Sequence, residues 1–373
     1  MLHGIRVLDI TRVLAGPLCG MALGDLGANV IKVERPVDGD DTRAWGPPFD
    51  DRGEAAYYLS INRNKLGVAL DLDSAADREL LEGLIAGADV VLDNYRIGML
   101  ARRGLAPERF LDAQPSLIWC TLTGFGPDSP RPGYDFVVQA ECGWMSISGV
   151  PDGEPMKIGV ALADVMAGKD ATIAVIAALA ARERAPLPLP LVQRRLFISL
   201  AHSATAALVN VAQNTLVSGQ EAKRWGNAHP NLVPYQLFPA ADRHLVIAVG
   251  NDAQWRSCCR ALSLPELESD PELTTNPGRL GARGRIVEAL SRRLAERPAA
   301  HWIAALEREG VPCGVVRGVR EALADVPASS LTGVSPSIPG TVRLPPPRLD
   351  EHGALVRAQG WNSFAAFAAD GAG

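Results

Sequence analysis

Short apolar runs alternate with helical patterns along the first third of the chain. Residues 5–10 (IRVLDI) and 29–34 (NVIKVE) each favour a buried strand. Between them, Pro17 suits the first turn of a helix, because its missing N–H group would have no partner there. The segment therefore predicts one strand–helix–strand unit.

The alternation continues to residue 123. Strands are expected at 66–72, 89–95 and 117–123, with helices at 74–88 and 107–113. Ser74 is a candidate N-cap, with Asp77 in the first turn that follows. This order predicts an α/β fold with an open parallel, Rossmann-like sheet, which binds ligands beyond the carboxyl ends of its strands.

The pattern changes in the second half. Helices are expected at 165–184 and 196–218, and prolines at 186, 188 and 190 separate them. After a polar loop at 224–234, one strand and three helices indicate a smaller α+β domain. We expect a large domain at 1–195, a linker helix at 196–224, a small domain at 225–325 and a C-terminal segment at 326–373 that returns to the large domain.

Composition narrows the class of protein. The 373 residues carry a net charge of -5 without a basic cluster, so no nucleic-acid partner is expected. The N-terminus lacks the apolar region of a signal peptide, and the longest apolar stretch is too short to span a bilayer. The six cysteines form no C-x-x-C pair. These features indicate a cytoplasmic protein with reduced thiols and no membrane partner.

Several common chemistries find no support. Residues 14–20 (LAGPLCG) are not G-x-G-x-x-G, and Pro17 removes an N–H group that pyrophosphate would need, so a dinucleotide site is disfavoured. The chain contains neither H-E-x-x-H nor G-x-S-x-G. We expect no metal.

Basic, amide and aromatic residues gather near the predicted strand ends. They are Arg35, Asn62, Asn64, Lys65, Asn94, Tyr95 and Arg102. They could converge on a phosphate-bearing ligand, although spacing alone favours solvated surface side chains. Asp164 lies in an apolar, small-residue segment just before a predicted helix. Local sequence favours an N-cap there, with a carboxylate nucleophile as the alternative.

Taken together, these segments resemble the class III CoA-transferase family (CaiB/BaiF type), which includes racemases. The matching segments are residues 8–17 (LDITRVLAGP), 26–36 (LGANVIKVERP), 62–65 (NRNK), 93–95 (DNY), 123–126 (TGFG), 132–135 (PGYD) and Asp164. Residues 38–49 (DGDDTRAWGPPF), 221–229 (EAKRWGNAH) and 233–236 (VPYQ) look closest to the succinyl-CoA:dicarboxylate branch, which includes the glutarate, itaconate and mesaconate transferases.

The resemblance implies an interlaced homodimer, acyl-CoA and a carboxylic acid as substrates, and no tightly bound cofactor. It implies that Asp164 is the nucleophile of an aspartyl anhydride and aspartyl-CoA thioester mechanism, with backbone N–H groups near the helix start stabilising oxyanions. It places CoA contacts at Leu14, Ala15, Arg35, Asn62, Lys65, Asn94, Tyr95, Arg102 and Tyr134.

Two other functions stay open. One is a 2-methylacyl-CoA racemase, which Tyr134 disfavours because the racemases carry His at that place and need a second acid/base group. The other is a CoA-binding protein without catalysis, because residues 185–195 lack the glycine-rich turn usual in the family and Phe197 replaces an expected Asp. A distal carboxylate of the acceptor could pair with Arg12, Arg43 or Arg131. The loop at 225–231 is a candidate cover for the site.

Overall fold

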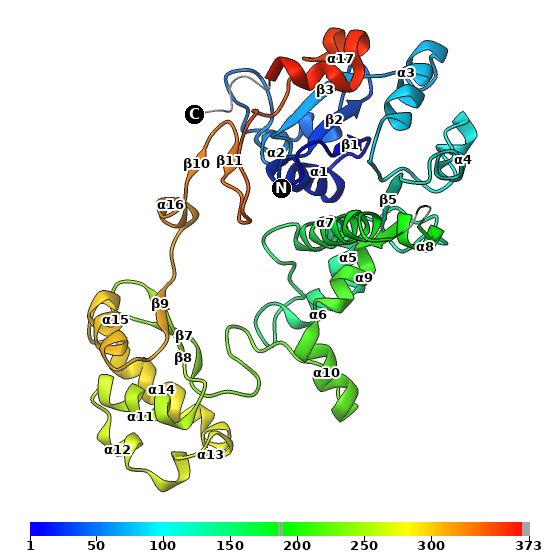
Figure 1. Cartoon of the computed structure of the whole chain (residues 1–373). Helices are drawn as coiled ribbons and strands as arrows, with labels where there is room; N and C mark the ends of the chain where they lie inside the picture. Colours follow the sequence, from blue (N-terminus) through cyan, green and yellow to red (C-terminus); the bar gives the residue numbers. More distant parts are fainter. Residues whose placement is uncertain (186, 188, 368–373) are drawn as a thin grey trace. The chain divides into compact units, whose positions relative to one another are not determined.

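The computed structural model describes residues 1–185, 187 and 189–367. The chain divides into two compact units (Figure 1). Unit 1 comprises Met1–Trp144, Lys157–Gly219 and the C-terminal segment that begins at Val326. Unit 2 comprises Met145–Met156 and Gln220–Asp325.

Unit 1 is built on a six-stranded parallel sheet with the order β3-β2-β1-β4-β5-β6. The strands are β1 (Arg6–Asp9), β2 (Asn29–Glu34), β3 (Lys65–Ala69), β4 (Val90–Asp93), β5 (Ile118–Thr123) and β6 (Arg195–Ser199). The predicted open parallel sheet is confirmed, with strand ends shifted by a few residues from the expected positions.

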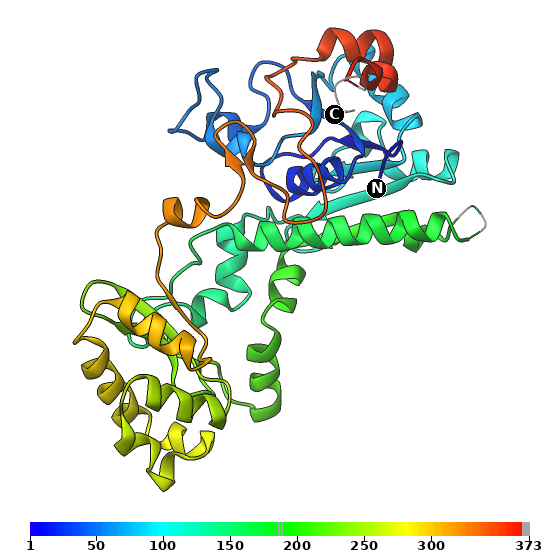
Figure 2. The ribbon, with the colours of Figure 1, turned by 60° about the vertical axis from the view of Figure 1, so that its left-hand side comes forward.

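Helices cover both faces of this sheet, because successive strand residues are buried on opposite sides. Val7 and Val90 pack with α1 (Ala15–Asp25), α7 (Leu162–Arg182) and α9 (Leu200–Ala206) on one face (Figure 2). Leu8 and Val91 pack with α3 (Ala75–Ala86), α4 (Pro107–Ala113) and α17 (Gly353–Gln359) on the other.

The remaining helices between residues 41 and 218 are η1 (Asp41–Ala44), α2 (Ala56–Leu59), η2 (Ala101–Arg103), α5 (Asp135–Glu141), α6 (Trp144–Ile147), α8 (Leu191–Arg194) and α10 (Val209–Ser218). The C-terminal segment adds the antiparallel pair β10 (Ala328–Ser329) and β11 (Gly333–Val334), and η4 (Gly360–Phe367).

The helix expected at 196–218 is wrong at its start. Residues 195–199 form β6, which continues the sheet beside β5 with Arg195 opposite Trp119. The Leu-Phe-Ile run at 196–198 suits a strand, and Ser199 then serves as the N-cap of α9 by accepting a hydrogen bond from the N–H group of His202. Pro186 and Pro188, in the altered turn, lie outside the described residues.

The C-terminal segment covers the outer edge of β3. The N–H group of Gly67 donates to Nδ1 of His352 (3.1 Å), and the Gly67 carbonyl accepts from the His352 N–H group (3.0 Å). The N–H group of Ala69 donates to the Asp350 carboxylate (2.7 Å). Backbone groups at this edge, which could otherwise pair with another chain, are therefore satisfied.

Unit 2 contains a three-stranded antiparallel sheet with the order β7-β8-β9. Its strands are β7 (Tyr235–Pro239), β8 (His244–Ala248) and β9 (Cys313–Val315). Its helices are α11 (Asp252–Ala261), α12 (Pro265–Glu268), η3 (Pro271–Leu273), α13 (Asn276–Gly281), α14 (Arg283–Leu294), α15 (Ala299–Arg308) and α16 (Val319–Leu323). No helix in the described part of the chain has the length and apolar character that crossing a bilayer requires.

An ion pair lies in the core of unit 1. Nζ of Lys65 donates to Oδ2 of Asp9 (2.8 Å), and both side chains are 0% exposed. The same Nζ donates to the carbonyl of Pro17 and to Oδ1 of Asn62. Each ammonium proton therefore has an acceptor, although burial still lowers the pKa of Lys65 to about 8.

Replacing Lys65 by Met should destabilise unit 1, because it leaves the Asp9 carboxylate buried and unpaired. We expect the free energy of unfolding to fall by about 3–5 kcal/mol in urea denaturation followed by circular dichroism. Arg109→Met, which removes the partner of Glu82 in an exposed pair, is the control and should leave the urea midpoint nearly unchanged. Equal losses in the two variants would contradict the prediction.

Candidate active site

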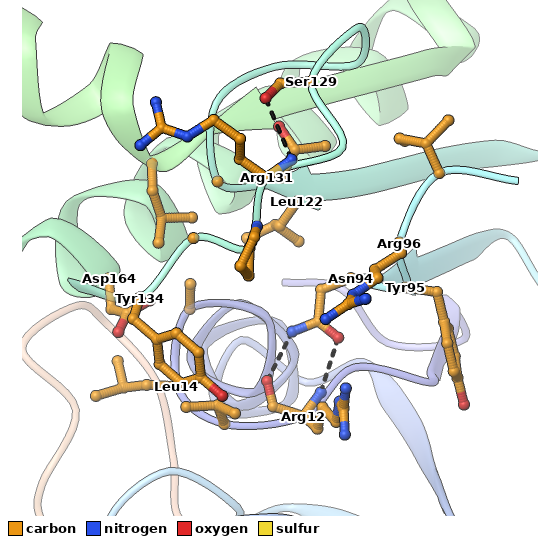
Figure 3. Close-up of a pocket in the computed structure, with 18 of the residues that line it drawn as sticks. Arg12, Leu14, Asn94, Tyr95, Arg96, Leu122, Ser129, Arg131, Tyr134 and Asp164 are labelled. Atoms are coloured by element: carbon orange, nitrogen blue, oxygen red, sulfur yellow. Dashed lines mark hydrogen bonds between the residues drawn. The ribbon is translucent and has the colours of Figure 1, made fainter. Parts of the chain in front are cut away.

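A pocket opens at the carboxyl ends of β1, β4 and β5 (Figure 3). Most of its lining comes from three loops, at residues 12–15 after β1, 94–97 after β4 and 123–134 after β5. Asp164, near the start of α7, forms another part of the wall. Connections from β1 and β4 run toward opposite edges of the sheet, so this is the crevice where open parallel sheets bind ligands.

The loop after β1 has an unusual backbone. Val13 has a φ of 73°, which β-branched residues rarely adopt. Its N–H group donates to Asp40 (3.2 Å), and Nζ of Lys32 donates both to Asp40 and to the carbonyl of Thr11 (3.0 Å each). Lys32 and Asp40 are buried, so their ion pair fixes this loop and stabilises the strained residue.

Asn94 anchors the same loop from the end of β4. Its Oδ1 accepts from the N–H group of Arg12 (3.1 Å), and its Nδ2 donates to the carbonyl of Arg12 (2.7 Å), as the dashed lines in Figure 3 show. Both ends of the amide therefore contact protein backbone. Asn94 thus positions the wall formed by Leu14 and Ala15.

Asp164 lies inside the first turn of α7, so the N-cap role favoured by local sequence is wrong. Ala161 is the N-cap residue and makes no side-chain cap. Oδ1 of Asp135, from α5, instead accepts from the N–H groups of Ala163 (2.8 Å) and Asp164 (3.4 Å). Because a distant carboxylate satisfies these groups, the helix begins at Leu162, earlier than predicted.

The Asp164 carboxyl group is buried, with a relative exposure of 9%. Burial raises its pKa to about 7, and the negative charge of Asp135 adds to the shift. Gly168, one turn later, allows α1 to approach: a Cβ there would lie 2.6 Å from the carbonyl oxygen of Ala15. Asp164 therefore provides a carboxyl group that is buried in the pocket wall and can ionise near neutral pH.

Two tyrosines lie near this carboxyl group. Tyr134 lies beside Asp164 in Figure 3 and is 59% exposed. Tyr57, in α2, packs edge-on against Trp45 with ring centroids 5.1 Å apart. Burial, followed by the negative charge of Asp164, raises the pKa of Tyr57 to about 12. The sequence did not mark Tyr57 as a site residue, and Trp45 appeared there only as part of the motif at residues 38–49.

A model described as CoA-transferase family III matches residues 2–352. The chain belongs to this family. Succinyl-CoA:glutarate CoA-transferase of Mus musculus is 43% identical, over 87% of this chain and 74% of its own length. Succinate–glutarate CoA-transferase of Agrobacterium fabrum is 37% identical, over 96% and 95%. The crystal structure of a CAIB/BAIF family protein from Brucella suis has a TM-score of 0.84 and 38% identity, over 96% of this chain and 98% of that one.

These comparisons confirm the family, the fold and the enzyme class that the sequence predicts. The pocket of this CoA-transferase family III member also gathers many of the residues that the resemblance marks. Those in its lining are Leu14, Ala15, Asn94, Tyr95, Tyr134 and Asp164.

Four marked residues lie outside the lining. Asn62 and Lys65 are fully buried. Arg35 is about half exposed and pairs with Asp41, a lining residue, at 2.6 Å. Arg102 is exposed within η2.

The three arginines considered for a distal carboxylate differ in their surroundings. Arg12 lines the pocket and pairs with Asp41 (3.0 Å). Arg131 also lines it, pairs with Glu141 and stacks over Phe125 at 4.0 Å. Arg43 is buried between two carboxylates, those of Glu34 and Glu54, and does not line the pocket. The structure therefore favours Arg12 or Arg131 over Arg43.

The loop at 225–231 belongs to unit 2. The Arg283 guanidinium lies over the Trp225 ring (5.1 Å), and its Nη2 donates to the carbonyls of His229 and Pro230 (3.0 Å each). The role of this loop as a cover stays a prediction. In the described part of the chain, no group of three His, Cys, Asp or Glu side chains is placed to hold a metal ion.

Replacing Asp164 by Asn should stabilise the protein at alkaline pH. Between about pH 4 and pH 7 the Asp164 carboxyl group loses its proton in the unfolded chain and keeps it in the folded chain. The free energy of unfolding of the wild type therefore falls as the pH rises through this range. We expect the free energy of unfolding of the variant to exceed that of the wild type by roughly 2 kcal/mol at pH 8 and by less at pH 5.

Urea denaturation of both proteins at the two pH values measures this difference. Asp112→Asn, on the exposed surface of α4, is the matched control and should show no gain. A gain of equal size at pH 5 and pH 8 would mean that the pKa of Asp164 is not raised.

Proposed function

We propose that this enzyme moves CoA from an acyl-CoA, such as succinyl-CoA, to a second carboxylic acid through covalent intermediates on Asp164. The observation that carries the proposal is a single buried carboxyl group with a pKa near 7 in the wall of the sheet-end pocket. The names of the mouse and A. fabrum relatives include glutarate, which supports a dicarboxylic acceptor.

The first half of the reaction transfers CoA to the enzyme. An Asp164 oxygen attacks the thioester carbonyl carbon, the C–O bond forms, the C–S bond breaks, and CoA leaves as a thiolate. The thiolate then attacks the Asp164 carboxyl carbon of this mixed anhydride. A new C–S bond forms, and the donor acid leaves as a carboxylate with the bonding electron pair. The second half reverses these steps with the acceptor acid.

The surroundings of Asp164 suit this chemistry. Low exposure keeps water away from an anhydride and a thioester, both of which water would hydrolyse. However, the N–H groups of Ala163 and Asp164 donate to Asp135. They are therefore not free to stabilise oxyanions, and the role expected for N–H groups at the helix start is not supported for these two.

We propose different roles for the residues that the resemblance marks as CoA contacts. The pocket has a volume of about 180 Å³, which suits one end of an acyl-CoA, since sites for whole ligands usually exceed 300 Å³. Leu14, Ala15, Tyr95 and Tyr134 would contact the thioester end, while Arg35 and Arg102 would meet phosphates outside the pocket.

Asn62 and Lys65 would act indirectly. Lys65 donates to the carbonyl of Pro17 and to Asn62, so the pair holds the first turn of α1 just behind Ala15. Their burial supports a role in placing the pocket wall rather than in contacting CoA.

We also infer a homodimer. Large apolar side chains of unit 1 are exposed on α7 and α10, including Ile173 (66%), Leu216 (77%) and Val217 (77%). Soluble monomers seldom leave such surfaces uncovered, so a second copy of the chain is the natural partner.

Asp164→Ala should abolish transfer while the fold survives, because it removes the carboxyl group on which the proposed acyl intermediates form. We expect the exchange of labelled succinate into succinyl-CoA to fall by at least about 10³-fold. Intact-mass measurement should show a covalent CoA adduct on the wild type and none on the variant.

Asp112→Asn, a neutralisation on the exposed surface of α4, is the control and should keep full activity. Exchange at the wild-type rate in Asp164→Ala would refute the proposed mechanism. CoA binding without transfer in the wild type would instead match the non-catalytic alternative.

Arg12→Gln tests the recognition of the acceptor. If the Arg12 guanidinium pairs with a distal carboxylate, KM for glutarate should rise about tenfold, while KM for pentanoate stays unchanged. Steady-state kinetics with both acids and one acyl-CoA measures the effect. Arg103→Gln, which removes an exposed partner of Asp73, is the control. An equal rise in KM for both acids, or a rise in KM for the acyl-CoA alone, would rule out this role of Arg12.

A further inference from the structure

Asp135 places a second carboxylate beside the proposed nucleophile, and the reaction steps above do not use it. It is the first residue of α5, directly after Tyr134. Its Oδ1 receives the N–H groups of Ala163 and Asp164, at 2.8 and 3.4 Å. The carboxylate is therefore fixed against the backbone of the residue whose side chain would react.

The other oxygen of Asp135 is equally constrained. Oδ2 accepts from Nε2 of Gln139 (2.7 Å), one turn later on α5. Gln139 is fully buried, and its Oε1 accepts from the N–H group of Ile158 (2.8 Å), while Nε2 also contacts the carbonyl of Val160 (3.3 Å). Asp135 and Gln139 together fix the segment 158–164 that leads into α7.

Neutral groups surround this arrangement. The partners of the Asp135 oxygens are backbone N–H groups and an amide, none of them charged. Burial, followed by the negative charge of Asp135, raises the pKa of the Asp164 carboxyl group. The other titratable groups that face it are Tyr134 and, from α2, Tyr57, whose pKa burial raises to about 12. Arg12 and Arg131 line other parts of the pocket and pair with carboxylates of their own.

We propose that Asp135 is a positioning residue whose negative charge disfavours the free Asp164 carboxylate and so favours the covalent CoA thioester on Asp164. This inference rests on the proposed function, because it requires Asp164 to be the nucleophile. The charge of Asp135 thus drives formation of the Asp164 thioester, in addition to the capping of α7 by the same carboxylate.

The charge balance of the half-reaction explains the effect. The Asp164 carboxylate and a neutral thioester group become a neutral Asp164 thioester and the carboxylate of the departing donor acid. The negative charge therefore leaves Asp164 when its carbon bonds to sulfur. Repulsion between the Asp164 carboxylate and the fixed Asp135 carboxylate exists before this step and not after it, so the equilibrium shifts toward the covalent intermediate.

Two neutral caps separate the charge of Asp135 from its capping role. In Asp135→Asn and Asp135→Ser an oxygen still accepts from the helix N–H groups, while the charge is removed. The wild type and each variant are equilibrated with succinyl-CoA and succinate at varied ratios, and intact-mass measurement gives the fraction of protein that carries CoA. In the variants we expect the ratio of succinyl-CoA to succinate at half occupancy to rise about tenfold, the factor that corresponds to one unit of carboxyl pKa.

A second readout is the pH dependence of kcat/KM. The acid limb reports the protonation of the proposed nucleophile, so removing a neighbouring negative charge should move its midpoint to lower pH. Asp112→Asn removes a charge of the same sign from the exposed surface of α4 and should change neither the midpoint nor the occupancy ratio.

The outcomes are distinct. Wild-type protein without any CoA adduct would refute the proposed function itself. An adduct in the wild type, with the same occupancy ratio and the same acid midpoint in both variants, would overturn the role of the Asp135 charge, even if rates fall. Loss of the fold in both variants, seen by circular dichroism, would also overturn it, since the residue would then be needed to build the site.

Discussion

Two buried lysine–aspartate pairs determine the geometry of unit 1 at the end of its sheet. Lys65 with Asp9 holds the first turn of α1, and Lys32 with Asp40 holds the loop that contains Val13. Burying these four charged groups on folding costs more free energy than burying apolar side chains of the same volume. Their contribution is therefore one of position: hydrogen bonds with fixed directions hold a loop that hydrophobic packing alone would leave free to shift.

The wall opposite this loop is held by a different device. α7 has no capping side chain of its own, and the carboxylate of Asp135 reaches its N–H groups from another helix. The helix start, the backbone of Asp164 and the loop bearing Tyr134 are thus joined by one residue. The carboxylate that fixes the start of α7 also raises the pKa of Asp164.

The sequence predicted the sheet well and the site only in part. Consecutive apolar residues, such as Val7 and Leu8, indicate a strand that is buried on both faces of the sheet. By contrast, β6 resembled the start of a helix, because a five-residue edge strand is too short to show its own period. The burial of Lys65 was also hidden, since an isolated lysine in a sequence is normally a surface residue and its acceptors lie far along the chain.

The same limit explains the error at Asp164. Local sequence contains an aspartate before an apolar helix and cannot reveal that Asp135 occupies the capping position from elsewhere in the fold. Tyr57 was missed for a related reason: only its three-dimensional closeness to Asp164 distinguishes it from other half-buried tyrosines. Six of the ten residues that the resemblance marks lie in the lining of the pocket, whereas only the coordinates show that Asn62 and Lys65 are fully buried outside it.

The covered edge of β3 has a consequence for the order of synthesis. Asp350 and His352, which satisfy the backbone of Gly67 and Ala69, leave the ribosome after all of unit 2 has been made. A nascent chain therefore carries an open sheet edge until this segment has been made, and open strand edges are prone to pair with neighbouring chains. A segment synthesised after unit 2 thus completes the sheet of unit 1.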